Sequence, residues 1–267
     1  MQTRGVPPDV VAGKYRIGRL LGGGGAGAVY RARDPSSQTE AAVKIIPASD
    51  LPDEAARMQL AEHGRTVAGV RHPAIVPVID SGVLPDGNGY VVMELVDGED
   101  LRSLLLREGT VEAAHTAAIV SSVAEGLEAA HRTGMLHLDL KPENILLPAV
   151  PAEAVARLVD FSAPGALVMG TPAYMAPEQL RGEAVDARSD VFALGVIAYE
   201  MLSGRLPFGR GSAADVVLAQ ARGVPSMDAG LPAALARAIR AALDEDADRR
   251  PATPQAFAHL VSASAGA

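Results

Sequence analysis

The hydrophobic and polar positions divide the chain into an N-terminal part of short strands and a longer C-terminal part of helices. Up to about residue 95, short segments rich in Val, Ile and Tyr alternate with clusters of Gly, Pro, Asp and Asn, a pattern that predicts strands. The predicted strands cover residues 15–22, 27–34, 40–46, 75–80 and 90–95. In this part only residues 51–70 have helical spacing and composition.

Beyond residue 98, Ala- and Leu-rich segments predict helices. The clearest covers residues 111–132, with Thr110 placed to cap its start and Gly134 placed to end it. Further helices are predicted at residues 186–203, 213–221, 231–243 and 254–262. We therefore predict an α+β fold of two lobes. A small β-rich lobe with one main helix covers residues 1–96, a larger helical lobe covers residues 97–263, and a flexible tail covers residues 264–267.

Composition and charge narrow the classes of function. The chain has 267 residues, of which 48% are apolar, enough for a substantial core. No apolar stretch reaches the roughly 20 residues of a membrane span and no basic-then-apolar leader opens the chain, so we expect no membrane insertion. The absence of cysteine fits a reducing compartment, and we expect a cytoplasmic location. A net charge of −8 without a Lys/Arg cluster weighs against nucleic-acid binding.

A glycine run stands between two predicted strands. It contains the pattern G-x-G-x-x-G-x-V as Gly22, Gly24, Gly27 and Val29. Glycines at such positions let backbone N–H groups approach phosphate oxygens, although a run of this kind can also be a plain flexible turn. A dinucleotide-binding motif would need a helix after the glycines and a P-loop would need Gly-Lys-Ser/Thr. A strand follows here instead, as in the phosphate-covering loop of protein kinases.

Such a loop predicts a lysine on the next strand, and Lys44 lies there between apolar residues. The alternative is a strand lysine whose ammonium group reaches to solvent. The glycine run beside it favours a phosphate-binding role.

Three polar residues further along have the chemistry that phosphoryl transfer needs. Asp139 and Asn144 are spaced as D-x-x-x-x-N, and Asp160 follows a short apolar strand. Together they offer oxygen ligands for Mg²⁺ and a carboxylate that orients a hydroxyl nucleophile. The alternative is a solvated surface turn, which the flanking apolar strands disfavour.

With these motifs in order, the sequence resembles the eukaryotic-like serine/threonine protein kinases of bacteria, from about Tyr15 to Val261. Further matching segments are HPAIV from His72, VVMELVDGEDL around Met93, GTPAYMAPE from Gly170, SDVFALG with Asp190, and Arg250 before Pro251. The resemblance implies that Asp190 holds the backbone of the catalytic loop, that Arg250 pairs with Glu178, and that His137 packs beneath Phe161.

The resemblance also implies roles at the site. Asp139, Lys141, Lys44 and Thr171 would be catalytic, and Asn144 and Asp160 would bind Mg²⁺, or Mn²⁺ in its place. Lys141 would neutralise the transferring phosphoryl group and indicates Ser/Thr specificity. ATP would contact Leu21, Gly22, Gly24, Gly27, Val29, Ala42, Lys44, Glu62, Met93, Glu94, Val96 and Leu146. Glu143 would attract a basic substrate residue or remain a solvated acid, and the sequence leaves both open, as it does the formation of a homodimer.

The sequence departs from the family pattern around the catalytic aspartate. Leu138 replaces the arginine that pairs with a phosphorylated activation loop, and the only hydroxyl between Phe161 and Gly170 is Ser162. Because both the receptor and the donor of such a phosphate are missing, we expect a kinase that loop phosphorylation does not switch. Ser162 also replaces a glycine, and because serine restricts the backbone there, this departure favours an inactive relative of the kinases.

The last departure concerns the glutamate that would pair with Lys44. The usual position falls on His63, with Glu62 one residue earlier. One residue is a rotation of about 100° on a helix, so Glu62 serves only if the turn around Gly64 and Gly69 absorbs it. We expect Glu62 to be the partner.

These observations predict ATP- and Mg²⁺-dependent phosphoryl transfer to Ser/Thr hydroxyls of proteins, because Lys44, Asp139, Asn144 and Asp160 are all present. The alternative is a pseudokinase that binds nucleotide and acts as a scaffold. Phosphorylation of a small molecule is disfavoured by the intact GTPAYMAPE segment.

Overall fold

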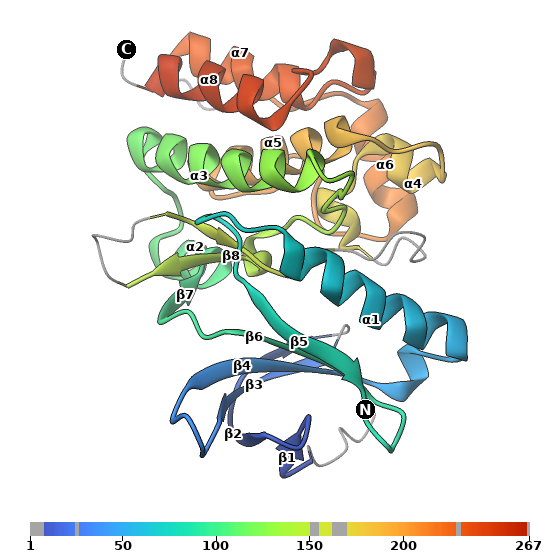
Figure 1. Ribbon diagram of the computed structural model, residues 1–267. Coiled ribbons are helices and arrows are strands. Elements are labelled where there is room, and N and C mark those ends of the chain that lie inside the picture. The colour runs from blue at the N-terminus through green and yellow to red at the C-terminus, as the bar shows by residue number, and fades with distance from the viewer. Residues whose placement is uncertain (1–7, 25–26, 150–154, 162–169, 228–230, 266–267) are drawn as a thin grey trace. The chain divides into compact units, whose positions relative to one another are not determined.

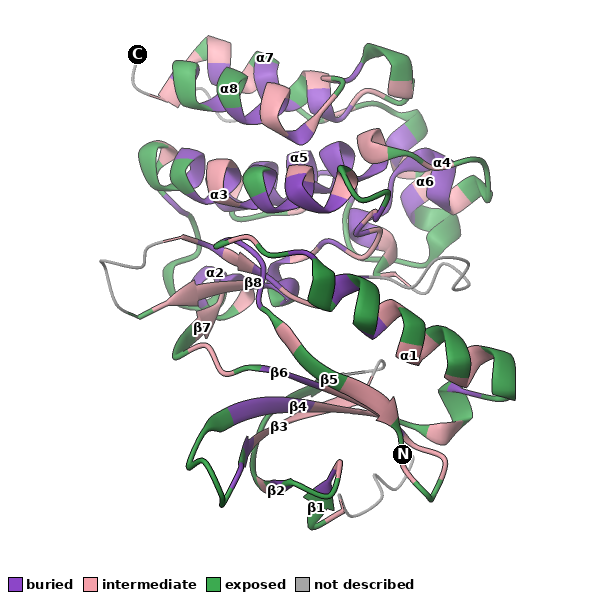
Figure 2. Ribbon diagram, in the orientation of Figure 1, coloured by how far each residue is buried: buried purple, intermediate pink, exposed green. Residues whose placement is uncertain are grey.

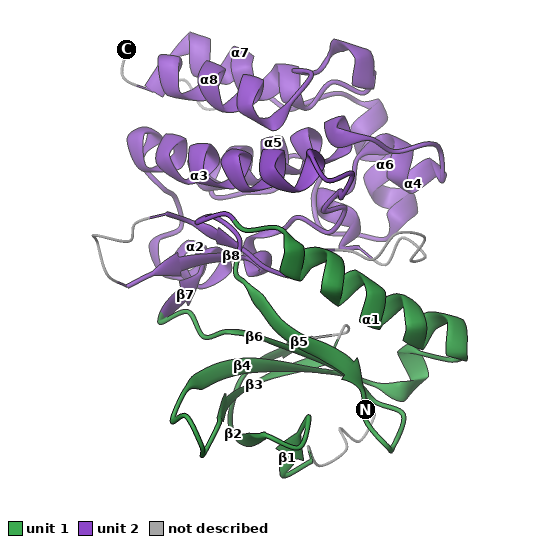
Figure 3. Cartoon of the chain, in the orientation of Figure 1, with its two compact units in different colours: residues 1–71, 76–97 green, residues 72–75, 98–267 purple. Residues whose placement is uncertain are grey.

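The computed structural model describes residues 8–24, 27–149, 155–161, 170–227 and 231–265. The chain forms two compact units, coloured separately in Figure 3. One consists of Met1–Arg71 and Val76–Asp97, and the other of His72–Ile75 and Gly98–Ala267. We refer to them as the sheet unit and the helical unit.

The sheet unit is built on an antiparallel sheet of six strands in the order β1-β2-β3-β4-β6-β5 (Figure 1). The strands are β1 Val10–Val11, β2 Tyr15–Gly24, β3 Gly27–Arg33, β4 Glu40–Ile46, β5 Val78–Val83 and β6 Gly89–Glu94. Their alternating side chains explain the two faces of the sheet, because successive residues of a strand point to opposite sides. One face forms a buried cluster with Val11, Tyr15, Ala41, Val43 and Val92.

Helix α1, Glu54–Gly69, completes the sheet unit and packs mainly on β5. The side chain of Asp53 caps its start by accepting a hydrogen bond from the backbone N–H of Ala56 at 2.8 Å. Gly64 permits the close approach to the sheet, because a Cβ there would lie 2.0 Å from Oγ of Ser81.

The helical unit is organised around a central helix, α5. Helix α5 is buried along nearly its whole length and packs against α3, α7 and α8, in the unit whose buried residues are purple in Figure 2. This explains why its sequence is apolar all round rather than along one stripe. The helices of this unit are α2 Leu101–Glu108, α3 Ala113–His131, α4 Pro177–Arg181, α5 Ala187–Ser203, α6 Ala213–Ala221, α7 Ala233–Ala242 and α8 Pro254–Ala265.

A small antiparallel sheet in the helical unit carries the loops of the candidate site. Its order is β7 Gly98–Asp100, β8 Ile145–Pro148 and β9 Arg157–Leu158. Residues His72–Ile75 belong with this unit because Ile75 forms a parallel bridge with Leu158, whose backbone N–H donates to the carbonyl of Ala74 at 2.8 Å.

Several elements differ from the sequence prediction. Helix α3 begins after Glu112 with no side-chain cap, so Thr110 is not its cap. The strand predicted at residues 75–80 lies at Val78–Val83 as β5, because Ile75 pairs in the helical unit. Helix α8 extends through Ala265 and buries Ser264, so residues 264 and 265 continue the helix where a tail was expected.

Gly134 adopts the positive φ of +78° that the prediction of a helix end requires. Among the helices of the described residues, none combines the length and the apolar character that a membrane crossing requires.

Candidate active site

In the sheet unit, the residues predicted to contact nucleotide share one face of the sheet. Val29 on β3 pairs with Lys44 on β4, and Ala42 on β4 pairs with Met93 on β6. Directly opposed residues of antiparallel strands point to the same side, and so do residues two apart on one strand. Val29, Ala42, Lys44 and Met93 therefore lie on the face opposite the buried cluster of Val43.

The glycine run forms the turn between β2 and β3. Gly24 pairs with Gly27, and residues 25 and 26 lie outside the described residues. Gly27 has φ +117°, and a Cβ there would lie 2.2 Å from the carbonyl oxygen of Ile45. A Cβ at Gly22 would meet nothing within 4 Å, and Leu21 before it is exposed. Glycine is therefore required by the fold at Gly27, whereas at Gly22 the backbone faces open space.

Helix α1 covers the same face of the sheet as Lys44. Lys44 pairs with Val91, and Val91 pairs with Ser81, which lies under Gly64 of α1. The sheet-facing stripe of a helix repeats every three to four residues.

That stripe runs through Leu60, Gly64 and Val67, and the spacing places His63 within it. Glu62 is exposed, and α1 continues without a break through Gly64. The helical register therefore brings His63 to the sheet-facing side and does not bring Glu62 there.

The remaining residues predicted to contact nucleotide lie at the end of the sheet unit and, in one case, in the helical unit. Met93 is buried, Glu94 is exposed at the end of β6, and Val96 follows half-buried. The backbone N–H of Glu94 donates to the carbonyl of Pro77 at 3.0 Å. Leu146 lies on β8 of the helical unit, opposite Asp100 of β7.

In the helical unit, a loop before β8 brings Asp139, Lys141 and Asn144 together. Nζ of Lys141 donates to Oδ2 of Asp139 at 2.7 Å. Nδ2 of Asn144 donates to the backbone carbonyl of Asp139 at 2.8 Å. Pro142 opens a 3₁₀ turn, Pro142–Asn144, that returns the chain and makes this contact. The turn leaves Oδ1 of Asn144 as the amide's acceptor, beside a carboxylate and an ammonium group.

The β8–β9 hairpin brings Asp160 to the same end as Asn144. Ile145 pairs with Leu158, and the backbone N–H of Val159 donates to the carbonyl of Asn144 at 3.1 Å. Asp160 follows with φ +62°, a conformation that costs energy for a residue other than glycine.

Leu138 also has a left-handed backbone, with φ +58°. Its backbone N–H donates to Oδ1 of Asp190 at 2.9 Å, and its carbonyl accepts a hydrogen bond from Nε2 of Gln179 at 2.9 Å. The neighbouring N–H of His137 donates to Oδ2 of the same aspartate at 2.9 Å. The predicted role of Asp190 is confirmed, and these bonds hold a conformation that a leucine would otherwise avoid.

His137 packs beneath Phe161, as the sequence predicted, with ring centroids 4.6 Å apart. Its Nε2 donates to the carbonyl of Val159 at 3.0 Å, which connects the catalytic loop to the chain before Asp160. Burial lowers the pKa of His137, because desolvation disfavours the charged imidazolium. Ser162 and the segment up to residue 169 lie outside the described residues.

Past that segment, the chain returns to Asp139. A Cβ added at Gly170 would lie 2.5 Å from Cε of Met175 and 3.5 Å from Oδ1 of Asp139. Thr171 follows, exposed, just before the 3₁₀ turn Pro172–Tyr174. The small residue at Gly170 thus lets this segment pass close to the Asp139 carboxylate.

The predicted pair of Glu178 and Arg250 is confirmed. The guanidinium of Arg250 donates to both carboxylate oxygens of Glu178, at 2.8 and 2.9 Å, and its side chain is fully buried. Burial raises the pKa of Glu178, but the hydrogen bonds from Arg250 and Ser189 outweigh burial, and the pKa lies below its ordinary value.

A second ionic network was not predicted from the sequence. Arg102 of α2 donates to Glu200 of α5 at 2.9 Å, to Glu143 of the catalytic loop at 3.0 Å, and to the hydroxyl of Tyr174. Burial by itself lowers the pKa of Arg102, and its hydrogen bonds, first that to Glu200, outweigh burial and raise it. Arg102 and Glu200 are far apart in sequence, and no local pattern links them.

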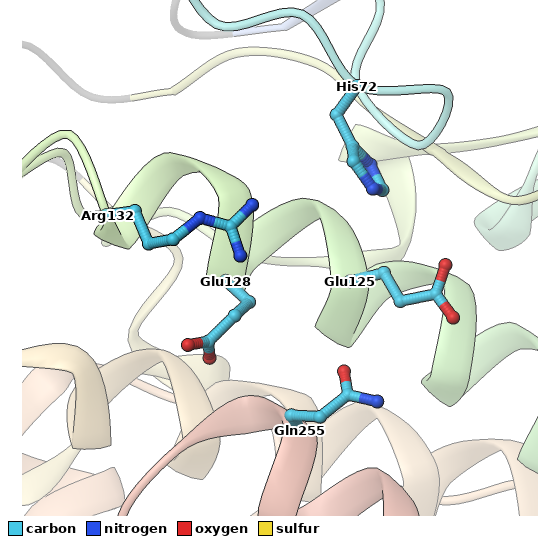
Figure 4. Close-up of a pocket in the computed structure, with 5 residues that line it drawn as sticks. All are labelled: His72, Glu125, Glu128, Arg132 and Gln255. Carbon is cyan, nitrogen blue, oxygen red and sulfur yellow. The ribbon is translucent and has the colours of Figure 1, made fainter.

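A separate polar pocket of about 330 Å³ lies between α3, α8 and the segment of His72. Figure 4 shows Glu125, Glu128 and Arg132 of the α3 side with Gln255 of α8 around it. None of the predicted site residues lines it, so it is not the candidate active site.

A sheet with a glycine-rich turn and a strand lysine, followed by a helical unit with an Asp-Lys-Asn loop, is the arrangement of a phosphotransferase of the kinase class. The family model of the protein kinase domain matches residues 15–261 of the chain. The chain belongs to the protein kinase family, as the sequence predicted.

The chain is similar to bacterial serine/threonine-protein kinases. It is 35% identical to serine/threonine-protein kinase pkn3 of Myxococcus xanthus, over 92% of this chain and 49% of the relative. It is 33% identical to serine/threonine-protein kinase PknB of Mycobacterium tuberculosis, over 91% of this chain and 41% of the relative. The chain therefore spans half or less of the length of these relatives.

Among solved structures, the chain is similar to the crystal structure of a mutant of the PknI kinase domain of Mycobacterium tuberculosis. The TM-score is 0.81 at 27% sequence identity, and the match covers 98% of this chain and 100% of the other. The predicted α+β kinase fold is confirmed.

Proposed function

We propose that the domain transfers the γ-phosphoryl group of ATP, with Mg²⁺, to Ser or Thr hydroxyls of protein substrates. The observation that carries this proposal is that one loop of this chain brings Asp139, Lys141 and Asn144 together. The similarity of the chain to serine/threonine-protein kinases supports the same chemistry. Phosphoryl transfer relies mainly on positioning and electrostatic stabilisation, and these groups supply both.

In the proposed reaction, the carboxylate of Asp139 orients the substrate hydroxyl and accepts its proton. The hydroxyl oxygen forms a bond to the γ-phosphorus while the bond to the β-phosphate oxygen breaks, and ADP leaves. Lys141, 2.7 Å from Asp139, offsets the negative charge of the phosphoryl group in flight. Thr171 lies in the segment that passes Asp139 and is proposed to contact the substrate.

The face of the sheet that carries Lys44 is proposed to hold the nucleotide. The shared orientation of Val29, Ala42, Lys44 and Met93 supports this assignment. Glu62 is omitted from the proposed set because it lies outside the sheet-facing stripe of α1. The full set comprises Leu21, Gly22, Gly24, Gly27, Val29, Ala42, Lys44, Met93, Glu94, Val96 and Leu146.

The donor atoms at Asn144 and Asp160 fit a hard divalent cation. Mg²⁺ prefers oxygen ligands, and the amide nitrogen of Asn144 is engaged by Asp139, which leaves Oδ1 for a metal. The carboxylate of Asp160 is the second proposed ligand. The metal would neutralise charge on the β- and γ-phosphates, with Mn²⁺ as a substitute.

The proposal includes a protein substrate and a site of action in the cytoplasm, where ATP is available. It also includes activity that does not depend on phosphorylation of the activation segment, because Leu138 offers no cation to receive such a phosphate.

The test measures labelled γ-phosphate transfer to a mixed Ser/Thr peptide library, alongside the melting temperature with and without Mg-ATP. We expect label on Ser or Thr and a rise in melting temperature, since ligands that bind the folded state stabilise it. Melting stabilisation without transfer would support a nucleotide-binding pseudokinase instead.

A further inference from the structure

Two carboxylates lie beside the segment that carries Thr171. Glu143 belongs to the catalytic loop, four residues after Asp139, and Glu200 is buried on α5 with 5% of its side chain exposed. Both are near a pocket of about 170 Å³ that Thr171, Arg102, Glu143 and Arg210 help to line. On their own, two such carboxylates next to the phosphorylation site would attract a basic substrate residue.

The protein supplies its own cation to this pair. The guanidinium of Arg102 donates through Nε to Glu143 at 3.0 Å and through a terminal nitrogen to Glu200 at 2.9 Å. Only 13% of its side chain is exposed. Tyr174 closes the arrangement by donating its hydroxyl to Glu200 at 2.5 Å. The planar guanidinium thus takes up the hydrogen-bonding positions that a substrate arginine would need.

Arg102 is fixed in place by its helix. It is the second residue of α2, and Asp100 caps that helix by accepting from the backbone N–H of Ser103 at 2.7 Å. A second cation, Arg210, lies 3.4 Å from Glu200 and is mostly exposed. The two carboxylates and the two guanidinium groups balance in formal charge. The pocket therefore has no net negative charge that would favour a substrate with arginine or lysine.

We propose that Arg102 is a specificity-determining residue: it satisfies the acidic pair of Glu143 and Glu200, so that the pocket beside Thr171 accepts an uncharged substrate side chain and does not select arginine or lysine. This rests on the proposed function, because the pocket matters only if a peptide lies beside Thr171. The sequence left open whether Glu143 binds a basic substrate residue or is a solvated acid. Under this proposal its carboxylate instead accepts a hydrogen bond from Arg102 of the same chain.

The first test uses the natural chain and a set of Ser/Thr peptides that carry Arg, Lys or Gln in turn at each position before the acceptor. We expect kcat/KM for the Arg and Lys peptides to stay within about threefold of the Gln peptide at every position, since a pocket whose acids already pair with internal guanidinium groups offers little net attraction to a further cation. A preference of about tenfold or more for a basic residue would overturn the proposal.

The second test replaces Arg102 by Met. The variant leaves Glu143 and Glu200 with room for a guanidinium, so we expect the Arg peptide to gain roughly tenfold over the Gln peptide at one position. Arg107→Met, on the exposed side of the same helix, is the matched control and should leave the ratio unchanged. No gain in a folded Arg102→Met variant would contradict the proposal.

Because Arg102→Met removes the closest cation from the buried carboxylate of Glu200, the melting temperature of the variant is measured first. If the variant does not fold, Arg102→Met combined with Glu200→Gln removes the buried negative charge as well, and this variant retains only the Glu143 carboxylate. We expect it to show a smaller gain for the Arg peptide, and the absence of any gain would count against the proposal. Peptide affinities from fluorescence anisotropy give the same comparison without catalysis, so failure of phosphoryl transfer remains distinguishable from failure of this inference.

Discussion

Leu138 occupies the position where a charged residue is usual in the family, and its backbone conformation accounts for how the loop tolerates the change. The left-handed conformation at φ +58° costs roughly 1–2 kcal/mol for an L-residue. The side chains of Asp190 and Gln179 hold that conformation, and they bond only to the backbone N–H and carbonyl of Leu138. The side chain at this position can therefore change without altering the placement of Asp139.

The glycine turn gives a prediction at single residues. Gly27→Ala should lower the free energy of unfolding by about 1–3 kcal/mol, because its Cβ would lie 2.2 Å from the carbonyl oxygen of Ile45. Gly22→Ala is the matched control, since nothing lies within 4 Å of its Cβ, and it should change stability by less than about 1 kcal/mol. Urea unfolding of both variants makes the comparison, and equal losses would contradict it.

At the scale of elements, the buried pair of Glu178 and Arg250 joins α4 to the chain before α8. Arg250 also donates to the carbonyl oxygens of Asp244, Arg188 and Glu245, and its guanidinium lies 4.9 Å from the ring centroid of Phe192. The pair therefore connects four segments of the helical unit.

We expect Arg250→Met to lower the free energy of unfolding by about 3–5 kcal/mol, because Glu178 would remain charged and buried with Ser189 as a hydrogen-bond donor but without the cation that neutralises it. Arg249→Met is the control, since Arg249 is largely exposed and pairs with Asp246 at 3.4 Å, and it should cost at most about 1 kcal/mol. Denaturant unfolding measures both. Similar losses for the two variants would show that the buried pair contributes no more than a surface pair.

The lowered pKa of Glu178 predicts a dependence of stability on pH. Its ordinary value is 4.5, and in the folded protein it is lower, so the folded state keeps the carboxylate ionised where the unfolded chain takes up a proton. The stability that this group contributes is complete above pH 4.5 and is lost as the pH falls below it. The difference in unfolding free energy between the natural chain and Glu178→Gln should therefore shrink below that pH. A constant or growing difference in urea unfolding at low pH would contradict this sign.

Most helices and strands could be predicted because their periodicity reflects which face is buried. Helix α2 was not predicted, because its eight residues follow directly on β7 and make only about two helical turns, too few for a clear periodicity. Thr110 has the chemistry of a helix cap, but the neighbouring N–H of Val111 donates to the carbonyl of Met201 instead, at 2.7 Å. This contact comes from tertiary packing, which local sequence does not contain.

The residues of the candidate site also fall into those that the sequence could predict and those that depend on tertiary packing. Asp139, Lys141 and Asn144 could be predicted as a group because all three lie in one loop. The register of α1 at His63 and the bridge from Arg102 to Glu200 could not, since both depend on how separate elements pack. Local motifs therefore predict the chemistry of this domain, while its partner residues and specificity follow from tertiary structure.

At the scale of the whole molecule, the chain consists of a sheet unit and a helical unit that carry complementary halves of the proposed chemistry. The sheet unit supplies Lys44 and the glycine turn, and the helical unit supplies Asp139, Asn144 and Asp160. Binding of nucleotide and transfer of phosphate are therefore separable by mutation: changes on the sheet face should act first on nucleotide affinity, and changes in the loop should act on transfer.

The most direct measurement is the rate of γ-phosphate transfer to a Ser/Thr peptide by the natural chain and by Asp139→Asn, with Mg-ATP. Asparagine keeps the size of the side chain but cannot accept the hydroxyl proton, so we expect the rate to fall by about 10²–10⁴-fold with little change in melting temperature. Equal rates for the two proteins, or no transfer by the natural chain, would contradict the assignment of this domain as an active serine/threonine kinase.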